Sequence, residues 1–357
     1  MSKRLIFTLM IILVVISLAG CIKFTKNKAV VPSNLGGVFV SADRLETWKS
    51  SSLLMTPGAT AGSITDVDVL FLRQDPSDDQ AMYLGTRANG LYFTYNNGEG
   101  WEQAKTVPGT NITDVAVDPK DKCTIYAASG DKVYKSEDCS RTWKYVWFSD
   151  NAEKTTISLD IDWYNPDIVY MGTNEGSIYR SKDGGTSWEK SAKFGAGRVS
   201  KIMVSPGDSR VVYAGIDGQG MYRTENSGAD WEDLNPAMKD FSGARNYYKF
   251  ALSKSNKDLV IYASKFGLLR SLDKGKTWSP IKLLTDLGEE VIFSIVIDPV
   301  DANKIYYGTD RGLYKSSDGG VTWTVKKMPT TRVPSELLIY PKDTNKIFMG
   351  VKTYQPK

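Results

Sequence analysis

The stretch Ser181-Lys182-Asp183-Gly184-Gly185-Thr186-Ser187-Trp188 decides the fold, because its pattern returns through most of the chain. Ser271-Leu-Asp-Lys-Gly-Lys-Thr-Trp278 and Ser316-Ser-Asp-Gly-Gly-Val-Thr-Trp323 are close copies of it. Seven of the nine tryptophans end a strong or weak copy, at spacings of 42 to 53 residues: Trp48, Trp101, Trp143, Trp188, Trp231, Trp278 and Trp323. Repetition at such a period indicates an architecture built from one recurring supersecondary unit.

The chemistry of the motif is that of a turn. An Asp or Asn side chain accepts hydrogen bonds from backbone N–H groups just after it, and glycine adopts the positive φ that a tight turn needs. The tryptophan that follows is a large apolar anchor between neighbouring units. Turn formation accounts for every residue of the motif, so a structural role rather than a ligand or metal site is predicted for its acidic or amide position: Asp43, Asn96, Asp138, Asp183, Asn226, Asp273 and Asp318.

Around each motif the same four strand patterns recur, which we name A to D in chain order. Apolar A strands such as 112–117 and 199–204 end in a Pro/Asp turn, and strand D begins at the tryptophan. Four short strands per repeat predict a propeller blade. The chain starts with a C/D pair and finishes with an A/B pair, which should combine into one blade. The expected fold is all-β: a seven-bladed β-propeller of four-stranded antiparallel blades, over residues 35–357.

The N-terminus predicts export. Lys3 and Arg4 precede an apolar run, 5–18, that is shorter than the ~18–20 residues of a spanning helix. Leu18-Ala-Gly-Cys21 resembles the lipobox of bacterial lipoproteins, which implies diacylglycerol on Cys21 and cleavage just before it. We therefore expect a signal peptide over 1–20, a lipidated cysteine and tether over 21–34, and anchoring to the outer face of a bacterial membrane. An uncleaved N-terminal anchor is the alternative.

The amino-acid composition excludes several classes of function. Loss of the leader lowers the net charge from +4 to +2, with no basic block, so nucleic acid is not an expected partner. Histidine is absent, which excludes Ser-His-Asp catalysis and histidine metal sites; no catalytic residue, metal or cofactor is predicted. Cys123 and Cys139 would lie opposite each other across strands B and C, so a disulfide is expected, with two free thiols as the alternative. A monomer is expected.

The repeats resemble the BNR/Asp-box family, whose propellers occur in sialidases, xyloglucanases, sortilin-type receptors and photosystem II assembly factors. Sialidases have six blades, xyloglucanases two tandem propellers and sortilins ten blades, whereas the assembly factors are single, seven-bladed and often lipoproteins. The resemblance implies a non-catalytic binding or assembly module for an envelope protein or glycan. The alternative is a glycoside hydrolase whose carboxylate pair would come from this set: Glu175, Asp217, Glu289, Glu290 and Asp310.

In propellers, ligands usually bind on the face that carries the D–A and B–C loops, and the Asp boxes lie on the opposite rim. The candidate binding face therefore comprises Trp147, Glu175, Arg198, Asp217, Arg245, Tyr247, Asp310 and Arg311. Trp147 is expected in an exposed loop, with local packing as the alternative. Alignment of the A strands also predicts a polar ring in the central channel: Asp66, Asp114, Asp160, Lys201, Lys249 and Glu336. This ring would hold a cation, a zwitterion, a sugar or water.

Overall fold

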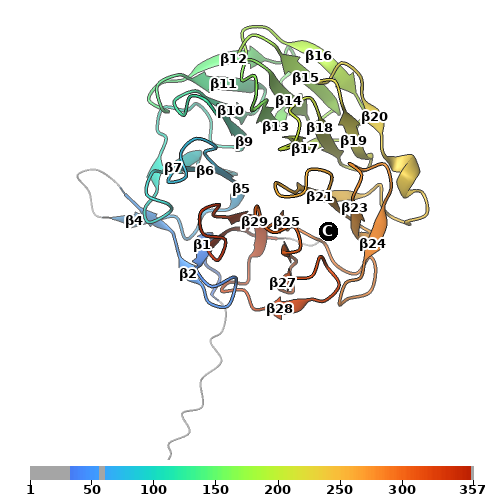
Figure 1. Ribbon diagram of the computed structural model, residues 1–357. Helices are drawn as coiled ribbons and strands as arrows, with labels where there is room; N and C mark the ends of the chain where they lie inside the picture. The colour runs from blue at the N-terminus through green and yellow to red at the C-terminus, as the bar shows by residue number, and fades with distance from the viewer. Residues whose placement is uncertain (1–32, 56–60, 355–357) are drawn as a thin grey trace, which may run out of the picture. The chain divides into compact units, whose positions relative to one another are not determined.

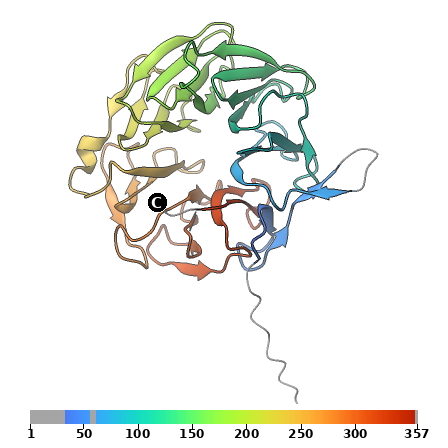
Figure 2. The same ribbon diagram turned by 180° about the vertical axis from the view of Figure 1, so that it is seen from behind.

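The computed structural model describes residues 33–55 and 61–354, so Cys21 and the leader lie outside the described residues. The part from Ser33 to Lys357 forms one compact unit. Within it, seven four-stranded antiparallel sheets stand around a central opening (Figures 1 and 2). The predicted all-β, seven-bladed propeller is confirmed.

Six blades are built from four strands that follow one another in the chain. In chain order their strands are β5 (Val69–Gln74), β6 (Met82–Thr86), β7 (Leu91–Thr94), β8 (Glu102–Gln103); β9 (Ile112–Val117), β10 (Ile125–Ser129), β11 (Lys132–Ser136), β12 (Lys144–Phe148); β13 (Thr156–Ile161), β14 (Val169–Thr173), β15 (Ser177–Ser181), β16 (Glu189–Lys193); β17 (Val199–Val204), β18 (Val212–Ile216), β19 (Gly220–Thr224), β20 (Glu232–Asp233); β21 (Tyr247–Leu252), β22 (Val260–Ser264), β23 (Gly267–Ser271), β24 (Ser279–Ile281); β25 (Ser294–Ile297), β26 (Ile305–Gly308), β27 (Leu313–Ser316), β28 (Thr324–Lys326).

The seventh blade joins the two ends of the propeller. Its sheet has the order β2 (Lys49–Ser50), β1 (Gly37–Ser41), β30 (Ile347–Lys352), β29 (Val333–Ile339). β1 and β30 pair antiparallel from Gly37 opposite Val351 to Ser41 opposite Ile347. This pairing removes the open sheet edges that an unclosed array would expose. Every blade is thus completed by residues of the unit that starts at Ser33, which therefore contains the contacts it needs to fold by itself.

A half-buried arginine, Arg332, reinforces this closure on the loop face. Arg332 Nη1 donates to Asp68 Oδ1 at 3.0 Å, and Arg332 Nε donates to the carbonyl of Asn34 at 3.2 Å. Asp68 Oδ1 also accepts the N–H of Thr353 at 2.7 Å. The start of the propeller, the first complete blade and the end of β30 are therefore held at one point.

A β-hairpin outside the seven blades was not predicted from the sequence. A short hairpin of β3 (Leu53–Leu54) and β4 (Gly62–Ser63) precedes the first complete blade and extends from the edge of the ring (Figure 1). Trp101 is fully buried beside it and donates its indole N–H to the carbonyl of Ser51 at 2.7 Å. The hairpin accounts for the longest interval between tryptophans, from Trp48 to Trp101.

The repeated motifs form the predicted turns. In the clearest copy, Asp183 Oδ1 accepts the Ser181 hydroxyl and the Ser187 N–H, each at 2.8 Å. Asp183 Oδ2 accepts the Ser187 hydroxyl at 2.6 Å. These bonds, led by the Ser187 hydroxyl, lower the pKa of Asp183 to about 2. Because the carboxylate is occupied by its own turn, it has little left with which to bind a ligand.

The structure pairs Cys123 with Cys139 in a disulfide that joins the start of strand B to the Asp box of the same blade. Cys139 and Ser140 have φ values of 57° and 66°, the left-handed region that glycines occupy in the Asp183 box. Two residues with a Cβ are therefore held where glycine is favoured. The crosslink offsets that local cost by limiting the unfolded chain.

Removal of this disulfide should destabilise the propeller measurably. For the Cys123→Ser/Cys139→Ser variant we expect a loss of about 3 kcal/mol in the free energy of unfolding, the value for a loop of this size. The matched variant Cys123→Ser/Cys139→Gly should recover roughly 0.4–1 kcal/mol, because glycine adopts the positive φ without strain. Denaturant unfolding of both variants measures the difference, and equal stability would contradict the role given to this backbone conformation.

The part of the chain that the structure describes has little helix. Its one helical segment is the 3₁₀ turn η1 (Asn235–Met238), and none of its helices is long and apolar enough to cross a membrane.

Candidate functional site: the central channel

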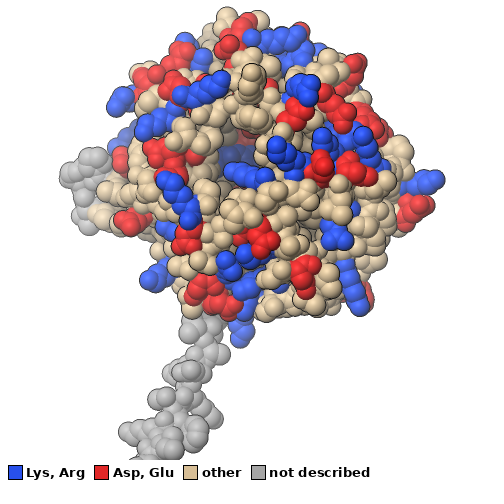
Figure 3. All heavy atoms as spheres, in the orientation of Figure 1, with Lys and Arg blue, Asp and Glu red and all other residues tan. Residues whose placement is uncertain are grey.

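The central channel is lined by the first strand of each blade, and two cavities of about 340 Å³ each occupy it. The loop-face cavity lies among residues that precede these strands or end the second strands, such as Arg198, Asp217 and Lys352. The turn-face cavity reaches the A–B turns at Pro206 and Pro341. A space-filling view shows a hollow at the centre of the ring with basic side chains inside it (Figure 3).

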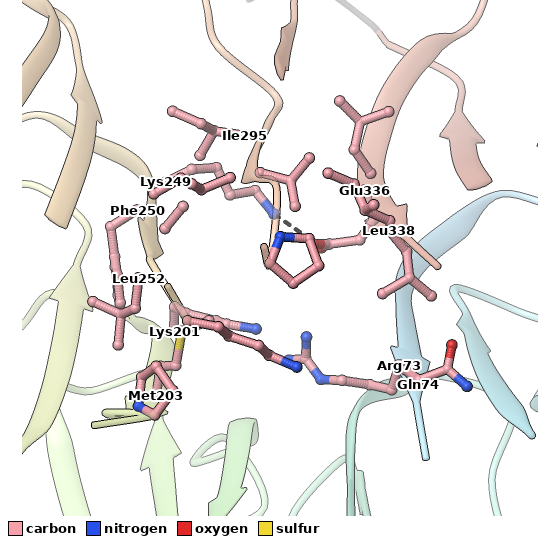
Figure 4. A pocket seen from close by; sticks show the side chains of 18 of the residues that line it. Arg73, Gln74, Lys201, Met203, Lys249, Phe250, Leu252, Ile295, Glu336 and Leu338 are labelled. Carbon is pink, nitrogen blue, oxygen red and sulfur yellow. Dashed lines mark ion pairs between the residues drawn. The ribbon is translucent and has the colours of Figure 1, made fainter. Parts of the chain in front are cut away.

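A charged ring divides the two cavities. Four of its side chains line both of them: Arg73, Lys201, Lys249 and Glu336. Figure 4 shows Arg73 and Lys201 reaching into the channel from opposite walls, and Lys249 directed at Glu336. The Lys249–Glu336 ion pair is loose, with 3.7 Å between its charged atoms.

Arg73 makes the tightest contact of this ring. Its Nη2 lies 2.7 and 2.9 Å from the two carboxylate oxygens of Asp114, which is almost fully buried. Asp114 also accepts the N–H of Leu159, from the next blade, at 3.1 Å. Burial opposes the charge on Arg73, but the carboxylates of Asp114, Glu336 and Asp160 raise its pKa overall. The pair therefore ties three blades together at the channel wall.

Of the residues predicted for a polar ring, the structure brings Asp114, Asp160, Lys201, Lys249 and Glu336 to the channel wall. The assignment of Asp66 to this ring was wrong. Asp66 is exposed in a turn before β5, which begins at Val69, and Arg73 takes the position in the channel.

This correction also removes support for a bound cation. Asp114 is neutralised by Arg73, and Asp160 accepts the backbone N–H groups of Val204 at 2.6 Å and Ile161 at 3.0 Å. Within the described ranges, 33–55 and 61–354, no cluster of acidic or cysteine side chains has the arrangement of a metal site. The channel is instead lined by more positively charged than negatively charged side chains.

Burial changes the pKa of two channel residues in the direction that favours the uncharged form. It lowers the pKa of Lys201 to about 8, and the nearby Arg73 adds to the effect. Burial likewise raises the pKa of Asp160 to about 6, against the stabilising N–H of Val204 and the charges of Arg73 and Lys201. Such shifts are common where charged groups are held ready for a ligand.

The predicted binding face is only partly assembled by the fold. Arg198 and Asp217 line the loop-face cavity, and Asp217 accepts the Ser200 hydroxyl at 2.6 Å. Arg245 and Asp310 are exposed but line none of the described cavities. Tyr247 was expected in a loop, but it is buried at the start of β21 and faces the cavity from the blade itself.

The expectation that Trp147 lies in an exposed loop was wrong. Trp147 belongs to β12, opposite Val133, and is half-buried. Its ring packs against Tyr179 of the next blade, with 5.6 Å between centroids. Trp147 therefore contributes to blade packing, which was the alternative interpretation.

Three positively charged residues that line the channel cavities were not predicted: Arg73, Lys254 and Lys352. Lys352 ends β30 and lines the loop-face cavity. Burial, together with the positive charges of Lys249, Arg87 and Arg198, lowers its pKa to about 8. Among the residues that the structure describes, neither Lys352 nor Arg198 has a carboxylate partner. The loop-face cavity thus holds uncompensated positive charge.

The carboxylates considered for glycoside hydrolysis do not face one another across a described cavity. Of the five, only Asp217 lines one. Glu290 is buried and accepts the Tyr314 hydroxyl at 3.1 Å, and Arg311 Nη1 lies 3.5 Å from Glu290 and 3.7 Å from Glu289. Glu175 lies near Lys193 and Lys154, at 3.8 and 4.0 Å. A hydrolase needs two carboxyls flanking the bond that it cleaves, and the described cavities do not bring two of these five residues together.

Known proteins share this architecture. A curated relative, the xyloglucanase Xgh74A of Acetivibrio thermocellus, is 26% identical over 274 residues, which are 70% of this chain and 29% of the relative. The chain thus matches less than a third of that enzyme. A solved structure of a GH74 xyloglucanase from Xanthomonas campestris is 17% identical, with a TM-score of 0.63, over 80% of this chain and 51% of the other.

The structure of YCF48 bound to D1 peptide is 18% identical to this chain, with a TM-score of 0.61, and the match covers 80% of this chain and 93% of that one. At these identities the structural matches show a shared fold. The family model described as photosynthesis system II assembly factor YCF48 matches residues 20–219. Because that match covers more than half of the 357 residues, the chain belongs to the YCF48 family of photosystem II assembly factors.

Proposed function

We propose that this protein is an exported, lipid-anchored binding module that holds an acidic segment of a partner polypeptide at its loop-face cavity. The anchor would be the lipid on Cys21, with the propeller presented at the outer face of a bacterial membrane. The family supports an assembly role, and a structure of its namesake with bound peptide supports a polypeptide as the ligand.

The observation that carries the proposal is the charge of the loop-face cavity. Five cations line it: Arg73, Arg198, Lys201, Lys249 and Lys352. Three carboxylates line it as well, Asp114, Asp217 and Glu336, and two of these are paired with Arg73 and Lys249. Arg198, Lys201 and Lys352 are left without a carboxylate partner among the described residues. Of these three, Arg198 and Lys352 line the loop-face cavity alone and remain for an anionic ligand. Charge-assisted hydrogen bonds from arginine and lysine to carboxylates are among the strong polar contacts of proteins.

Loss of these two cations should weaken binding of an acidic peptide. The probe is a short glutamate–glycine peptide with a free carboxyl terminus, titrated by calorimetry into residues 33–357. We expect the Arg198→Gln/Lys352→Met variant to bind it about tenfold or more weakly, because two charge-assisted contacts are lost.

The matched control is the Arg141→Gln/Lys276→Met variant, which also removes one arginine and one lysine, but from the Asp-box rim. Both rim residues are exposed, and this variant should bind the peptide like the native protein. A glutamine–glycine peptide should bind weakly to all three proteins. Equal weakening by the two double variants would show net-charge attraction without a site and would overturn the proposal.

Binding should also depend on pH near the pKa of Lys352. Its folded pKa of about 8 lies below the ordinary 10.5, so the ammonium is charged below about pH 8 and is lost as the pH rises through that value. We therefore expect peptide affinity to fall between about pH 7 and 9, with a midpoint above 8 in the complex because the bound carboxylate favours the charged form.

The Lys352→Arg variant is the control for this pH dependence. Arginine stays charged throughout the range, so the loss of affinity with pH should become shallower, and Lys201 accounts for what remains. An identical pH profile for the native protein and this variant would show that Lys352 does not contact the peptide.

A further inference from the structure

The walls of the turn-face cavity are mainly apolar, although the cavity lies in an open channel. Its walls come from the first strands of the blades and expose apolar side chains that are only half-buried: Met203, Leu252, Val296 and Leu338. Prolines form part of its rim, at Pro206, Pro299 and Pro341. Its volume of about 340 Å³ falls within the ~300–1,000 Å³ of small-molecule sites. Apolar walls that converge on a few charged groups are the usual form of such a site.

The inner end of this cavity is the charged ring, and its charges do not balance. Arg73 is paired with Asp114, and Lys249 lies 3.7 Å from Glu336. The oxygens of Asp160 are taken by backbone N–H groups. Lys201 has no hydrogen bond or ion pair with any described residue, and it reaches into the channel (Figure 4). Lys201 is therefore the one unpaired positive group at the inner end of this cavity. The other unpaired cation of its lining, Lys254, is exposed and follows the end of β21, on the side of the A–B turns.

We propose that the turn-face cavity binds a small amphiphile with a single carboxylate, whose head contacts the Lys201 ammonium and whose hydrocarbon body lies along Met203, Leu252, Val296 and Leu338. The unpaired ammonium selects a carboxylate over an alcohol or a cationic head. The apolar walls select a hydrocarbon body over a polar one, because burial of apolar surface is favourable. Burial lowers the pKa of Lys201, and a bound carboxylate would restore its charge.

This site shares Lys201 with the loop-face cavity, but its apolar walls lie outside the peptide site proposed above. Met203, Leu252, Val296 and Leu338 line the turn-face cavity and not the loop-face cavity. Substitutions at these four positions therefore change the amphiphile site without touching Arg198 or Lys352.

The test is calorimetric titration of residues 33–357 with decanoate below its micelle concentration, compared with decanol, decyltrimethylammonium and acetate. We expect one decanoate per chain, bound at least about tenfold more tightly than each comparator. The Lys201→Met variant should bind decanoate and decanol about equally. Leu252→Gln should weaken decanoate binding several-fold by placing an amide against the chain.

Leu272→Gln is the matched control, because Leu272 is an exposed residue of the Asp box 271–278, away from the channel lining. This variant should bind decanoate like the native protein. Unfolding midpoints identify any variant that has lost its fold, and Met203→Gln replaces Leu252→Gln in that case. Equal affinity of the native protein for decanoate and decanol would overturn the proposal. So would retention of the carboxylate preference in Lys201→Met, or unchanged decanoate binding in both wall variants.

Discussion

Replacement of Arg73 by methionine is expected to lower the free energy of unfolding by about 3–5 kcal/mol, the cost of breaking a buried ion pair from one side. The Asp114 carboxylate would lose both contacts to the guanidinium, at 2.7 and 2.9 Å, while staying almost fully buried. The N–H groups of Val115 and Leu159 would remain its only protein donors among the described residues. Chemical unfolding followed by tryptophan fluorescence measures the loss.

The double variant Arg73→Met/Asp114→Asn is the control for this prediction. Its asparagine carries no charge and still offers an oxygen to the Leu159 N–H, so the double variant should be more stable than Arg73→Met alone. A double-mutant cycle with Asp114→Asn isolates the pairwise energy. A loss below about 1 kcal/mol in Arg73→Met would mean that channel water solvates Asp114 as well as the arginine does.

Truncation after Asn345, which removes β30, is expected to abolish cooperative folding. β30 holds Ile347, Phe348, Met349 and Val351 at 0–1% exposure and pairs with both β1 and β29. Each of these side chains contributes about 1.5–3 kcal/mol by burial, so their sum is comparable with the whole stability of a domain, ~5–15 kcal/mol. Circular dichroism and thermal unfolding of the truncated chain measure the effect.

Addition of a synthetic peptide of residues 346–354 is the matched rescue. If the loss comes from the missing strand, the peptide should pair with β1 and restore a cooperative transition, whereas a peptide of the same composition in scrambled order should not. A truncated chain that unfolds cooperatively at the native midpoint would contradict the view that β1 and β30 close the ring.

The fold was predictable because its decisive signals are local. Each Asp box forms its turn from residues within one short segment, as Ser181, Asp183 and Ser187 do, so the sequence alone reveals it. The closing blade followed from the same repeat, because the two ends carried complementary halves. The β3–β4 hairpin was missed because its strands have two residues each and no alternation to detect.

The site was less predictable because it depends on register and on which strands meet. The polar ring was misaligned in the first complete blade, because Asp66 precedes the innermost strand β5, which begins at Val69. Arg73, near the other end of β5, reaches the channel instead. Trp147 was misplaced because β12 extends to Phe148, whereas β8 and β20, the corresponding strands of other blades, have two residues.

Lys352 shows a different limit of sequence reasoning. It stands at the end of the last strand, with no motif around it, and reaches the cavity only because β30 is enclosed between β1 and β29. Its pKa is lowered by burial and by the positive charges of Lys249, Arg87 and Arg198, which lie on other blades. No local sequence pattern predicts that these positive charges from different blades come together.

The most direct test of the proposed peptide site is amide hydrogen exchange of residues 33–357 with and without saturating glutamate–glycine peptide. Binding at the loop-face cavity predicts slower exchange around Arg198, Asp217 and Lys352, with unchanged exchange in the Asp-box turns such as 183–188. Slower exchange confined to the Asp-box turns, with none around the loop-face cavity, would contradict the proposed function.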